Sequence, residues 1–341
     1  MTATMRAALW TGPEQIEYAE VERPTPADDQ VLIKIAYAGI CGTDLTIYLG
    51  KHPRARAPLI MSHEFSGAVA ADPSGKLGPG TPVVVNPLLT CGHCYACRNG
   101  LSHICDTLGL VGIDADGGFA EYVAAPAHTV RPIPAGLSLQ RAALVEPLAV
   151  AVHAVSVSDL RVGDVTAVLG AGPVGILVAQ VARLAGALRV FVSEVSPRRL
   201  AIARDLGFSV IDATKADPVQ EIVAATGGEG VPVVFESAGS QATIAQAGRI
   251  ARLGGQILQV GMPKGPVTID VTPVMFREVR SKPIRVYREQ DVQQAIAIAA
   301  SGRVDLDRPV THILPIAELA RGLELSHAAT EACKVLIAPA V

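Results

Sequence analysis

The chain has 341 residues, more than a single hydrophobic core usually organises, so we expect two domains. Half of the residues are hydrophobic and 18% are charged, a composition that excludes intrinsic disorder. The 29 basic and 32 acidic residues give a net charge of -3 without a basic segment, which argues against nucleic acid or membrane partners. The first residues lack the pattern of a secretory signal, so we expect a cytoplasmic protein.

The first part of the chain is rich in short strand-like segments. Val31–Ile35 and Val83–Val85 are typical, and Gly, Pro and Asp separate such segments between residues 5 and 133. This punctuation predicts an antiparallel, loop-rich β domain. We place its first part at residues 1–150.

Three motifs in this part carry metal-binding residue types. They are Cys41-Gly42-Thr43-Asp44, Ser62-His63-Glu64, and Glu146 at the start of a predicted helix. Cysteine, histidine and carboxylate are the ligands of open catalytic zinc sites. Each residue also has an ordinary structural explanation, and the spacing alone leaves the choice open.

Four cysteines lie close together between two of these motifs. Cys91, Cys94, Cys97 and Cys105 follow the spacing C-x2-C-x2-C-x7-C, which suits a tetrahedral zinc site. An iron–sulfur cluster is the competing assignment, but the last gap of seven residues does not match the ferredoxin spacing. Because four thiolates leave no open position, we expect this zinc to be structural.

From residue 151 to 286, apolar strands alternate with amphipathic helices, which predicts βαβ units and a parallel sheet. The expected strands are Val165–Leu169, Val190–Ser193, Ser209–Ile211, Val231–Phe235 and Gln256–Val260. The expected helices are Val174–Leu184, Pro197–Leu206, Pro218–Ala225 and Gln241–Arg252. The uncharged run 165–182 contains glycines and a proline, so we interpret it as a strand, turn and helix rather than a membrane span.

The turn after the first of these strands carries a G-x-G-x-x-G pattern in Gly170, Gly172 and Gly175, with Pro173 and Val174 opening the helix. Bare backbone there allows a dinucleotide pyrophosphate to reach the helix N-terminus. Glu194 follows Gly175 by 19 residues, close to the spacing of a carboxylate that binds the adenosine ribose. This favours NAD, although Arg198 and Arg199 are candidates for binding the additional phosphate of NADP.

The C-terminal segment, residues 287–341, is too short for a core of its own, so we expect it to rejoin the first domain. It contains a predicted helix at Val292–Ala300 and a strand at Cys333–Ile337. We interpret the isolated Cys333 as a small core residue.

Taken together, these motifs resemble the zinc-dependent medium-chain alcohol dehydrogenases, and within them the polyol branch of sorbitol, threonine and butanediol dehydrogenases. The resemblance runs over nearly the whole chain, through Cys41–Asp44, Met61–Gly67, the cysteines, Glu146–Ala149, the glycine pattern and Val335. It implies an α/β fold with a GroES-like β-rich catalytic domain, split in sequence around a Rossmann domain of doubly wound parallel sheet. It also implies two zinc ions per chain, a homodimer or homotetramer, and a small-molecule alcohol as substrate.

The resemblance further implies roles for individual residues. Cys41 and His63 would hold the catalytic zinc, with Glu64 and Glu146 supplying carboxylate directly or through water. Adjacent side chains on an extended segment point in opposite directions, so His63 and Glu64 can both ligate only where the backbone turns. Asp44 would orient His63, and Thr43 would pass on the proton that leaves the alcohol before hydride reaches the nicotinamide.

Two positions depart from the family pattern. Thr46 stands where a relay histidine is common, with His52 as a candidate replacement, and Ser62 stands in place of the usual glycine. The main expectation is an NAD-dependent oxidoreductase acting on a secondary alcohol of a polyol, diol or sugar alcohol. The alternatives are a threonine-type 3-hydroxy amino acid dehydrogenase, with Arg285 and Arg288 as candidate carboxylate ligands, and a catalytically silent cofactor-binding protein.

Overall fold

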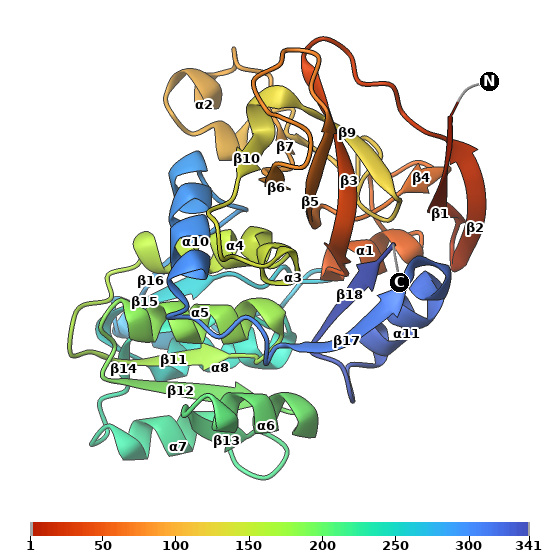
Figure 1. The fold of residues 1–341 in the computed structure, drawn as a ribbon. Coiled ribbons are helices and arrows are strands. Elements are labelled where there is room, and N and C mark those ends of the chain that lie inside the picture. The colour runs from red at the N-terminus through yellow and green to blue at the C-terminus, as the bar shows by residue number, and fades with distance from the viewer. Residues whose placement is uncertain (1–2, 340–341) are drawn as a thin grey trace. The chain divides into compact units, whose positions relative to one another are not determined.

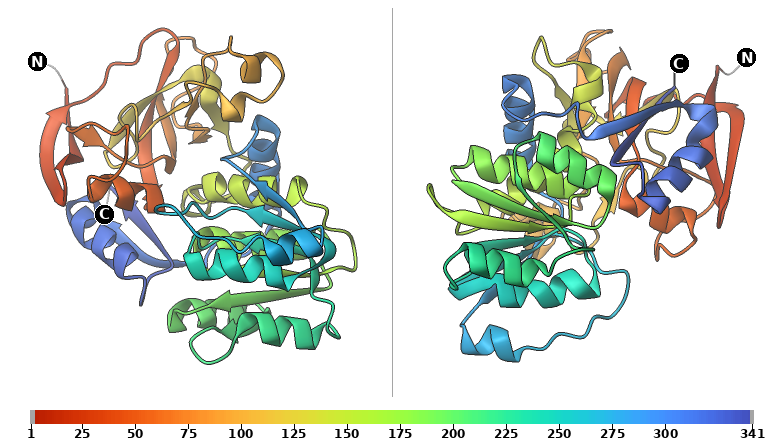
Figure 2. Two further views of the ribbon diagram at one scale, coloured as in Figure 1. Left: turned by 180° about the vertical axis from the view of Figure 1, so that it is seen from behind. Right: turned by 90° about the horizontal axis from the view of Figure 1, so that it is seen from below.

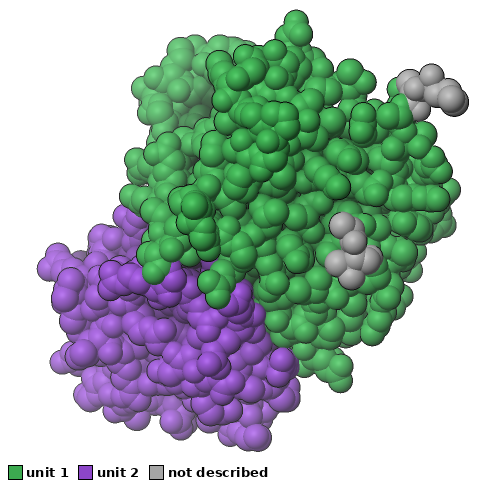
Figure 3. Space-filling model, viewed as in Figure 1, with its two compact units in different colours: residues 1–146, 288–301, 310–341 green, residues 147–287, 302–309 purple. Residues whose placement is uncertain are grey.

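The computed structural model describes residues 3–339, and the chain divides into two compact units. Unit 1 comprises residues 1–146, 288–301 and 310–341, and unit 2 comprises residues 147–287 and 302–309 (Figure 3). Residues 147–150, 287 and 302–309 therefore group with unit 2, whereas the sequence analysis placed 1–150 and 287–341 in the first domain.

Unit 1 is built mainly from antiparallel strands (Figure 1). The strands of its largest sheet are β3 (Gln30–Gly39), β5 (Glu64–Ala71), β6 (Pro82–Val85), β9 (Tyr122–Pro126), β10 (Val130–Pro132), β17 (Val310–Pro315) and β18 (Lys334–Ala338). Their order is β10-β6-β5-β3-β18-β17, with β9 also paired to β3. A second sheet contains β1 (Thr4–Gly12), β2 (Gln15–Glu22) and β4 (Leu59–Ile60). A third sheet consists of β7 (Leu88–Leu89) and β8 (Gly109–Leu110).

Unit 1 also contains the helices α1 (Gly42–Tyr48), α2 (Tyr95–Arg98), α3 (Leu139–Ala142), α10 (Glu289–Ser301) and α11 (Leu319–Ala328). It has 3-10 turns at Ser102–Ile104, Ala127–Thr129 and Ile316–Glu318. Helix α4 (Val145–Ser156) begins in unit 1 and continues into unit 2.

The C-terminal strand lies within the sheet of unit 1. Strand β18 pairs with β3 so that Leu336 is opposite Gly39, and β3 pairs with β5 so that Gly39 is opposite Glu64. Residues almost 300 positions apart in sequence are therefore neighbours, and Cys333 is buried as expected.

Unit 2 contains a six-stranded parallel sheet with the order β13-β12-β11-β14-β15-β16. The strands are β11 (Val165–Leu169), β12 (Arg189–Glu194), β13 (Ser209–Asp212), β14 (Val231–Glu236), β15 (Ala251–Gln259) and β16 (Arg280–Pro283). The helices are α5 (Pro173–Leu184), α6 (Pro197–Asp205), α7 (Pro218–Ala225), α8 (Gln241–Ile250) and α9 (Thr272–Phe276). Helices cover both faces of the sheet (Figure 2), which is the predicted α/β architecture.

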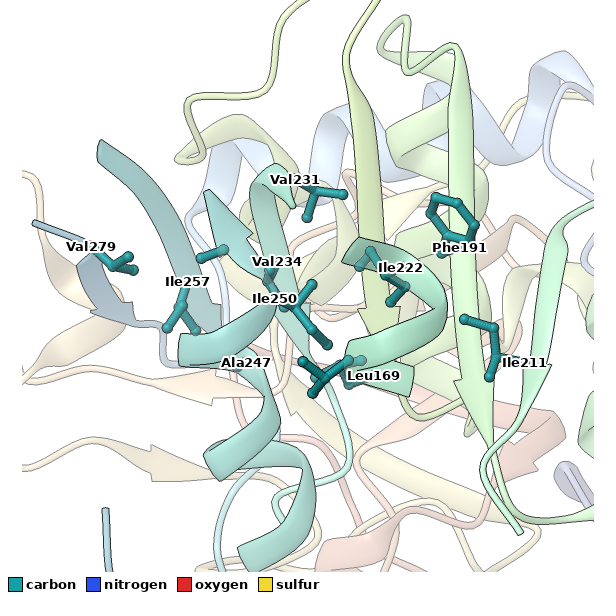
Figure 4. Packing of buried hydrophobic residues seen from close by; sticks show 13 residues of the cluster. Leu169, Phe191, Ile211, Ile222, Val231, Val234, Ala247, Ile250, Ile257 and Val279 are labelled. Carbon is teal, nitrogen blue, oxygen red and sulfur yellow. The ribbon is translucent and has the colours of Figure 1, made fainter. Parts of the chain in front are cut away.

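The core on one side of this sheet consists of aliphatic residues and Phe191 (Figure 4). Ile222 of α7 and Ile250 of α8 are fully buried against Leu169 and Val234 from the strands. Truncating a buried isoleucine of this kind to alanine costs about 2–5 kcal/mol. Within residues 3–339, no helix combines the length and the apolar character that crossing a membrane requires.

Candidate active site and metal centres

Cys41, His63 and Glu64 come together in unit 1, and we call them the Cys41 cluster. A ligand atom of each lies within 4.8 Å of the other two. Cys41 is the N-cap of α1, and Glu64 is the first residue of β5, so both are placed at the ends of regular elements. His63 and Glu64 are buried, and Cys41 is partly exposed. The structure thus brings together three of the predicted ligands.

The backbone at Ser62 explains how two neighbouring residues serve one site. Ser62 has a φ of 79°, in the left-handed region that a non-glycine residue seldom adopts. The chain therefore turns immediately before His63, as the sequence analysis required. The Ser62 hydroxyl donates to the carbonyl of Gly39 at 3.1 Å, and this bond helps to hold a serine where the family has glycine.

Asp44 fixes the backbone of both segments that form the cluster. Its carboxylate is fully buried and accepts hydrogen bonds from the Cys41 N–H at 2.8 Å and the Ser62 N–H at 3.2 Å. The Nδ1 atom of His63 has no hydrogen-bond partner. Asp44 therefore does not bond to Nδ1 of His63, and it acts on the ring through its charge and through the backbone.

The electrostatics of the cluster favour a cation. Burial lowers the pKa of His63, but the charge of Cys41 and its hydrogen bond, followed by the charges of Asp44 and Glu146, raise that pKa well above 6.5. Burial raises the pKa of Asp44. A buried imidazole close to a thiol and a carboxylate is a donor set that zinc prefers.

Glu146, in the first turn of α4, lies outside the three-residue set, although its charge acts on His63. Thr43 Oγ1 lies 3.9 Å from Cys41 Sγ. The hydroxyl of Thr46 donates to the carbonyl of Gly42 at 3.1 Å and is thus engaged within α1.

His52 has a fixed orientation in the loop after α1. Its Nδ1 accepts from the N–H groups of Ala55 at 3.1 Å and Arg54 at 3.3 Å, so Nε2 of the neutral ring carries the proton. Burial lowers the pKa of His52, the Arg54 charge adds to this, and His63 is also close enough to contribute. His52 is therefore a neutral donor near the Cys41 cluster.

The cysteine quartet, Cys91, Cys94, Cys97 and Cys105, forms a second compact group. Its sulfur atoms lie within 4.8 Å of one another, and three of their separations are 3.5, 3.9 and 4.0 Å. A zinc tetrahedron with bonds of about 2.3 Å has sulfur separations of about 3.8 Å. The quartet therefore fits a four-thiolate zinc site, and its thiols form no disulfide.

Backbone N–H groups stabilise thiolates within the quartet. The N–H of Cys91 points to Cys105 Sγ at 3.4 Å, and that of Cys94 points to Cys91 Sγ at 3.3 Å. The hydrogen bond from Cys91 lowers the pKa of Cys105 to about 6, whereas burial and the Cys94 thiol raise the pKa of Cys97 to about 12.

The glycine pattern forms the predicted turn between β11 and α5. Gly170 has a φ of 98°, and Gly172 is the N-cap of α5 with Pro173 at the first helical position. A side chain on Gly175 would overlap the carbonyl oxygen of Gly170. The free N-terminus of α5 is thus open to an anionic group.

Glu194 is tied to the turn itself. Its carboxylate accepts from the N–H of Ala171 at 2.8 Å, Val195 at 2.7 Å and Ser196 at 3.0 Å. Because a carboxylate offers about four acceptor positions, one remains for a ribose hydroxyl. A Cβ added to Gly172 would lie 3.9 Å from Nη1 of Arg199, so this guanidinium reaches toward the glycine turn.

Glu236 and Lys334 are buried charged residues that the sequence analysis did not single out. Glu236, at the end of β14, is fully buried and accepts from the N–H groups of Ala238 and Gly239, both at 2.9 Å. Lys334, the first residue of β18, is 1% exposed and contacts the carboxylate of Glu64. Glu236 shapes the turn after β14, whereas Lys334 borders the Cys41 cluster. Glu236 follows the apolar residues of β14, and Lys334 precedes those of β18. Their burial depends on how distant strands pair, which local sequence does not specify.

Comparisons with known proteins agree with this architecture. The family model described as "Alcohol dehydrogenase GroES-like domain" matches residues 27–135, and that described as "Zinc-binding dehydrogenase" matches residues 173–301. The 2-dehydro-3-deoxy-L-galactonate 5-dehydrogenase of Pseudoalteromonas atlantica is 37% identical over 92% of this chain and 93% of its own length. The L-threonine 3-dehydrogenase of Bacillus velezensis is 36% identical over 90% of each chain. A zinc-binding dehydrogenase of Sinorhizobium meliloti, solved with NADP, superposes with a TM-score of 0.93 at 32% identity, covering 99% of this chain and 100% of its own.

These matches define the class of protein. The chain belongs to the zinc-dependent medium-chain alcohol dehydrogenase family, with a GroES-like unit and a Rossmann-type unit. It is an oxidoreductase that transfers hydride between an alcohol and a nicotinamide cofactor, and its family identifies zinc as its metal.

Proposed function

We propose that the Cys41 cluster holds the catalytic zinc, that Glu146 supplies a further carboxylate, and that the cysteine quartet holds a second, structural zinc. The observation that carries this proposal is the convergence of the Cys41 thiol, the His63 ring and the Glu64 carboxylate, whose ligand atoms all lie within 4.8 Å of one another. Zinc at such a site acts as a Lewis acid and lowers the pKa of a hydroxyl bound to it.

The chain's own residues would orient the alcohol and remove its proton. Thr43 is close to Cys41 and offers a hydroxyl that can both accept and donate. Thr46 cannot pass the proton onward while its hydroxyl donates to Gly42. We infer that the proton leaves through Thr43 and solvent, with His52 donating to a substrate oxygen. Replacing His52 by glutamine should then raise KM more than it lowers kcat.

The substrate is proposed to be a secondary alcohol within a small polyhydroxylated molecule, such as a polyol, diol or sugar alcohol. The galactonate-type dehydrogenase among the relatives supports this class. The test is NADH formation by zinc-loaded protein with a panel of polyols, diols, sugar acids and 3-hydroxy amino acids. Turnover of simple primary alcohols alone would contradict the proposal.

A threonine-type activity is the second candidate. The relative that acts on L-threonine supports it, and so does Arg288, whose buried Nε lacks a hydrogen-bond partner and would suit a substrate carboxylate. Arg285, the other candidate, lies exposed in unit 2. If Arg288→Gln leaves the KM for threonine unchanged, a role of this guanidinium in carboxylate binding is refuted.

NAD is proposed as the preferred cofactor, and NADP is the alternative. Glu194 retains an acceptor for a ribose hydroxyl, which supports NAD, whereas Arg198 and Arg199 and the NADP-bound relative support NADP. Comparing kcat/KM for the two cofactors decides between them. Replacement of Arg199 by alanine should weaken NADP more than NAD.

The protein is further proposed to form a homodimer or homotetramer through unit 2. Five large apolar side chains in one segment are 47–84% exposed, namely Met262, Ile269, Val271, Met275 and Phe276. A cavity of about 270 Å³ adjoins them, lined in part by Ile244 and Val274. A second copy of the chain would cover this surface. Light scattering should give at least twice the chain mass, and a monomer after Phe276→Glu.

A cytoplasmic location is also proposed. No disulfide joins any of the six cysteines, all of which lie within residues 3–339, and this fits a reducing compartment. Cell fractionation tests this directly, because recovery in an oxidising compartment would contradict it.

A further inference from the structure

Lys334 is a fully buried lysine that contacts the Cys41 cluster. Its side chain is 1% exposed, and its Nζ donates to the carbonyl of Ile40 at 2.9 Å and to Oε2 of Glu64. Glu64 is 2% exposed. Because lysine is almost never fully buried without a partner, this ion pair is a defined feature of the fold.

The backbone is shaped to accommodate the pair. Gly39 lies on β3 between the two strands that carry Glu64 and Lys334. A Cβ at this position would lie 2.9 Å from Cε of Lys334 and would overlap the Glu64 carboxylate. Because Gly39 has no side chain, the Lys334 ammonium and the Glu64 carboxylate can come into contact beside it.

The position of the ammonium affects how Glu64 can serve a metal. Oε2 of Glu64 is engaged by Lys334, while a carboxylate oxygen of Glu64 is also within 4.8 Å of the ligand atoms of Cys41 and His63. The charges of Cys41 and Glu146 also attract this ammonium. The Lys334 ammonium and a bound cation would therefore be attracted to the same negative groups. The two positive charges would also repel each other.

We propose that Lys334 is a positioning residue of the metal centre, which holds Oε2 of Glu64 and thereby limits how tightly Glu64 can bind the zinc. This inference rests on the proposed assignment of the Cys41 cluster as the catalytic zinc site. Glu64 is then a carboxylate whose position an ion pair fixes.

The test compares the rate at which a chelator removes the catalytic zinc from the wild type and from Lys334→Met. The proposal expects slower release by roughly ten-fold, the size of effect that residues behind metal ligands commonly have, together with a lower kcat. A purely structural lysine predicts the opposite, because the loss of a buried partner would loosen the site and speed release. Faster or unchanged release from folded Lys334→Met would overturn the proposal.

Two further variants make the result specific. In a Glu64→Gln background, Lys334→Met should change zinc release much less, since the charged carboxylate is gone. Lys282→Met is a matched control, because Lys282 Nζ donates to the carbonyl of Val157 at 3.0 Å in unit 2, and it should leave zinc release unchanged. If Lys334→Met does not fold, Lys334→Gln keeps a donor for the Ile40 carbonyl and serves the same comparison.

The zinc content per chain tests the proposed assignment of the Cys41 cluster separately. If wild-type protein carries only the quartet zinc and Glu64→Gln leaves the zinc content unchanged, the assignment of the Cys41 cluster has failed. If two zinc ions are present but Lys334→Met does not slow release, the assignment stands and the proposed role of Lys334 is refuted.

Discussion

Replacement of Asp44 by asparagine tests how the Cys41 cluster is built. The Asp44 carboxylate accepts one backbone N–H at each oxygen, from Cys41 at 2.8 Å and from Ser62 at 3.2 Å. An asparagine keeps one acceptor oxygen and turns an N–H2 group toward the other N–H, so one hydrogen bond to a charged group is lost. Such a bond contributes about 1.5–3 kcal/mol, and relief from burying a charge offsets part of the loss. We therefore expect the free energy of unfolding to fall by about 2 kcal/mol.

The assay is equilibrium unfolding in urea, followed by the fluorescence of Trp10. Trp10 is the single tryptophan and lies buried in unit 1, so it reports on the unit that contains Asp44. Free zinc must be held constant, because metal that binds the folded state also stabilises it. Asp72→Asn is the control, since Asp72 also accepts two backbone N–H groups, from Ser74 and Leu77, but in a solvent-accessible loop. If Asp44→Asn is no more destabilising than Asp72→Asn, the argument about the buried carboxylate is wrong.

Three other changes have defined outcomes. Gly175→Ala should abolish NADH binding in a fluorescence titration, because the added methyl overlaps the Gly170 carbonyl; retained affinity would contradict the described turn. Cys105→Ser should lower the zinc content by one per chain and lower the melting temperature, and an unchanged zinc content would refute a site in the quartet. Burial raises the pKa of Glu289, but hydrogen bonds from Arg131 and Asn86 lower it overall below 4.5. Its stabilisation is therefore present above pH 4.5 and is lost as the pH falls through the lower folded-state pKa. Glu289→Gln should reduce the fall in the free energy of unfolding that occurs as the pH drops below 4.5. An unchanged pH dependence would show that Glu289 does not contribute to it.

Much of the Rossmann-type unit follows from sequence pattern alone. Strand β11 and helix α7 begin and end at the predicted residues, because apolar runs bounded by Gly, Pro and Asp define them locally. Strand β15 begins five residues before the predicted start, since Ala251 at its beginning pairs with Val231 of β14 across a register shift. That extension depends on a partner strand that local sequence does not specify.

The candidate site also combines features that local sequence predicts with features that depend on the tertiary structure. Residue type and order predicted Cys41, His63 and Glu64, and the need for a turn before His63 followed from strand geometry. The left-handed backbone at Ser62 is a property of the tertiary structure, because most serines adopt other conformations. Lys334 could not be assigned from sequence, since its burial depends on β18 lying beside β3.

Glu194 shows that spacing identifies a residue without revealing all of its bonds. The distance from Gly175 predicted a carboxylate for the ribose, whereas the structure adds three backbone N–H donors that fix the side chain in the turn. Such bonds to local backbone compete for the same oxygen atoms as a ligand does. They also pre-orient the one acceptor position that remains.

The measurement that tests the central claim most directly is the zinc content per chain of the wild type and of Cys41→Ser, with NAD-linked activity measured on the same samples. The account predicts close to two zinc ions in the wild type and close to one in the variant, with activity lost. One zinc ion in both proteins would contradict it, because the Cys41 cluster would then not be a zinc site.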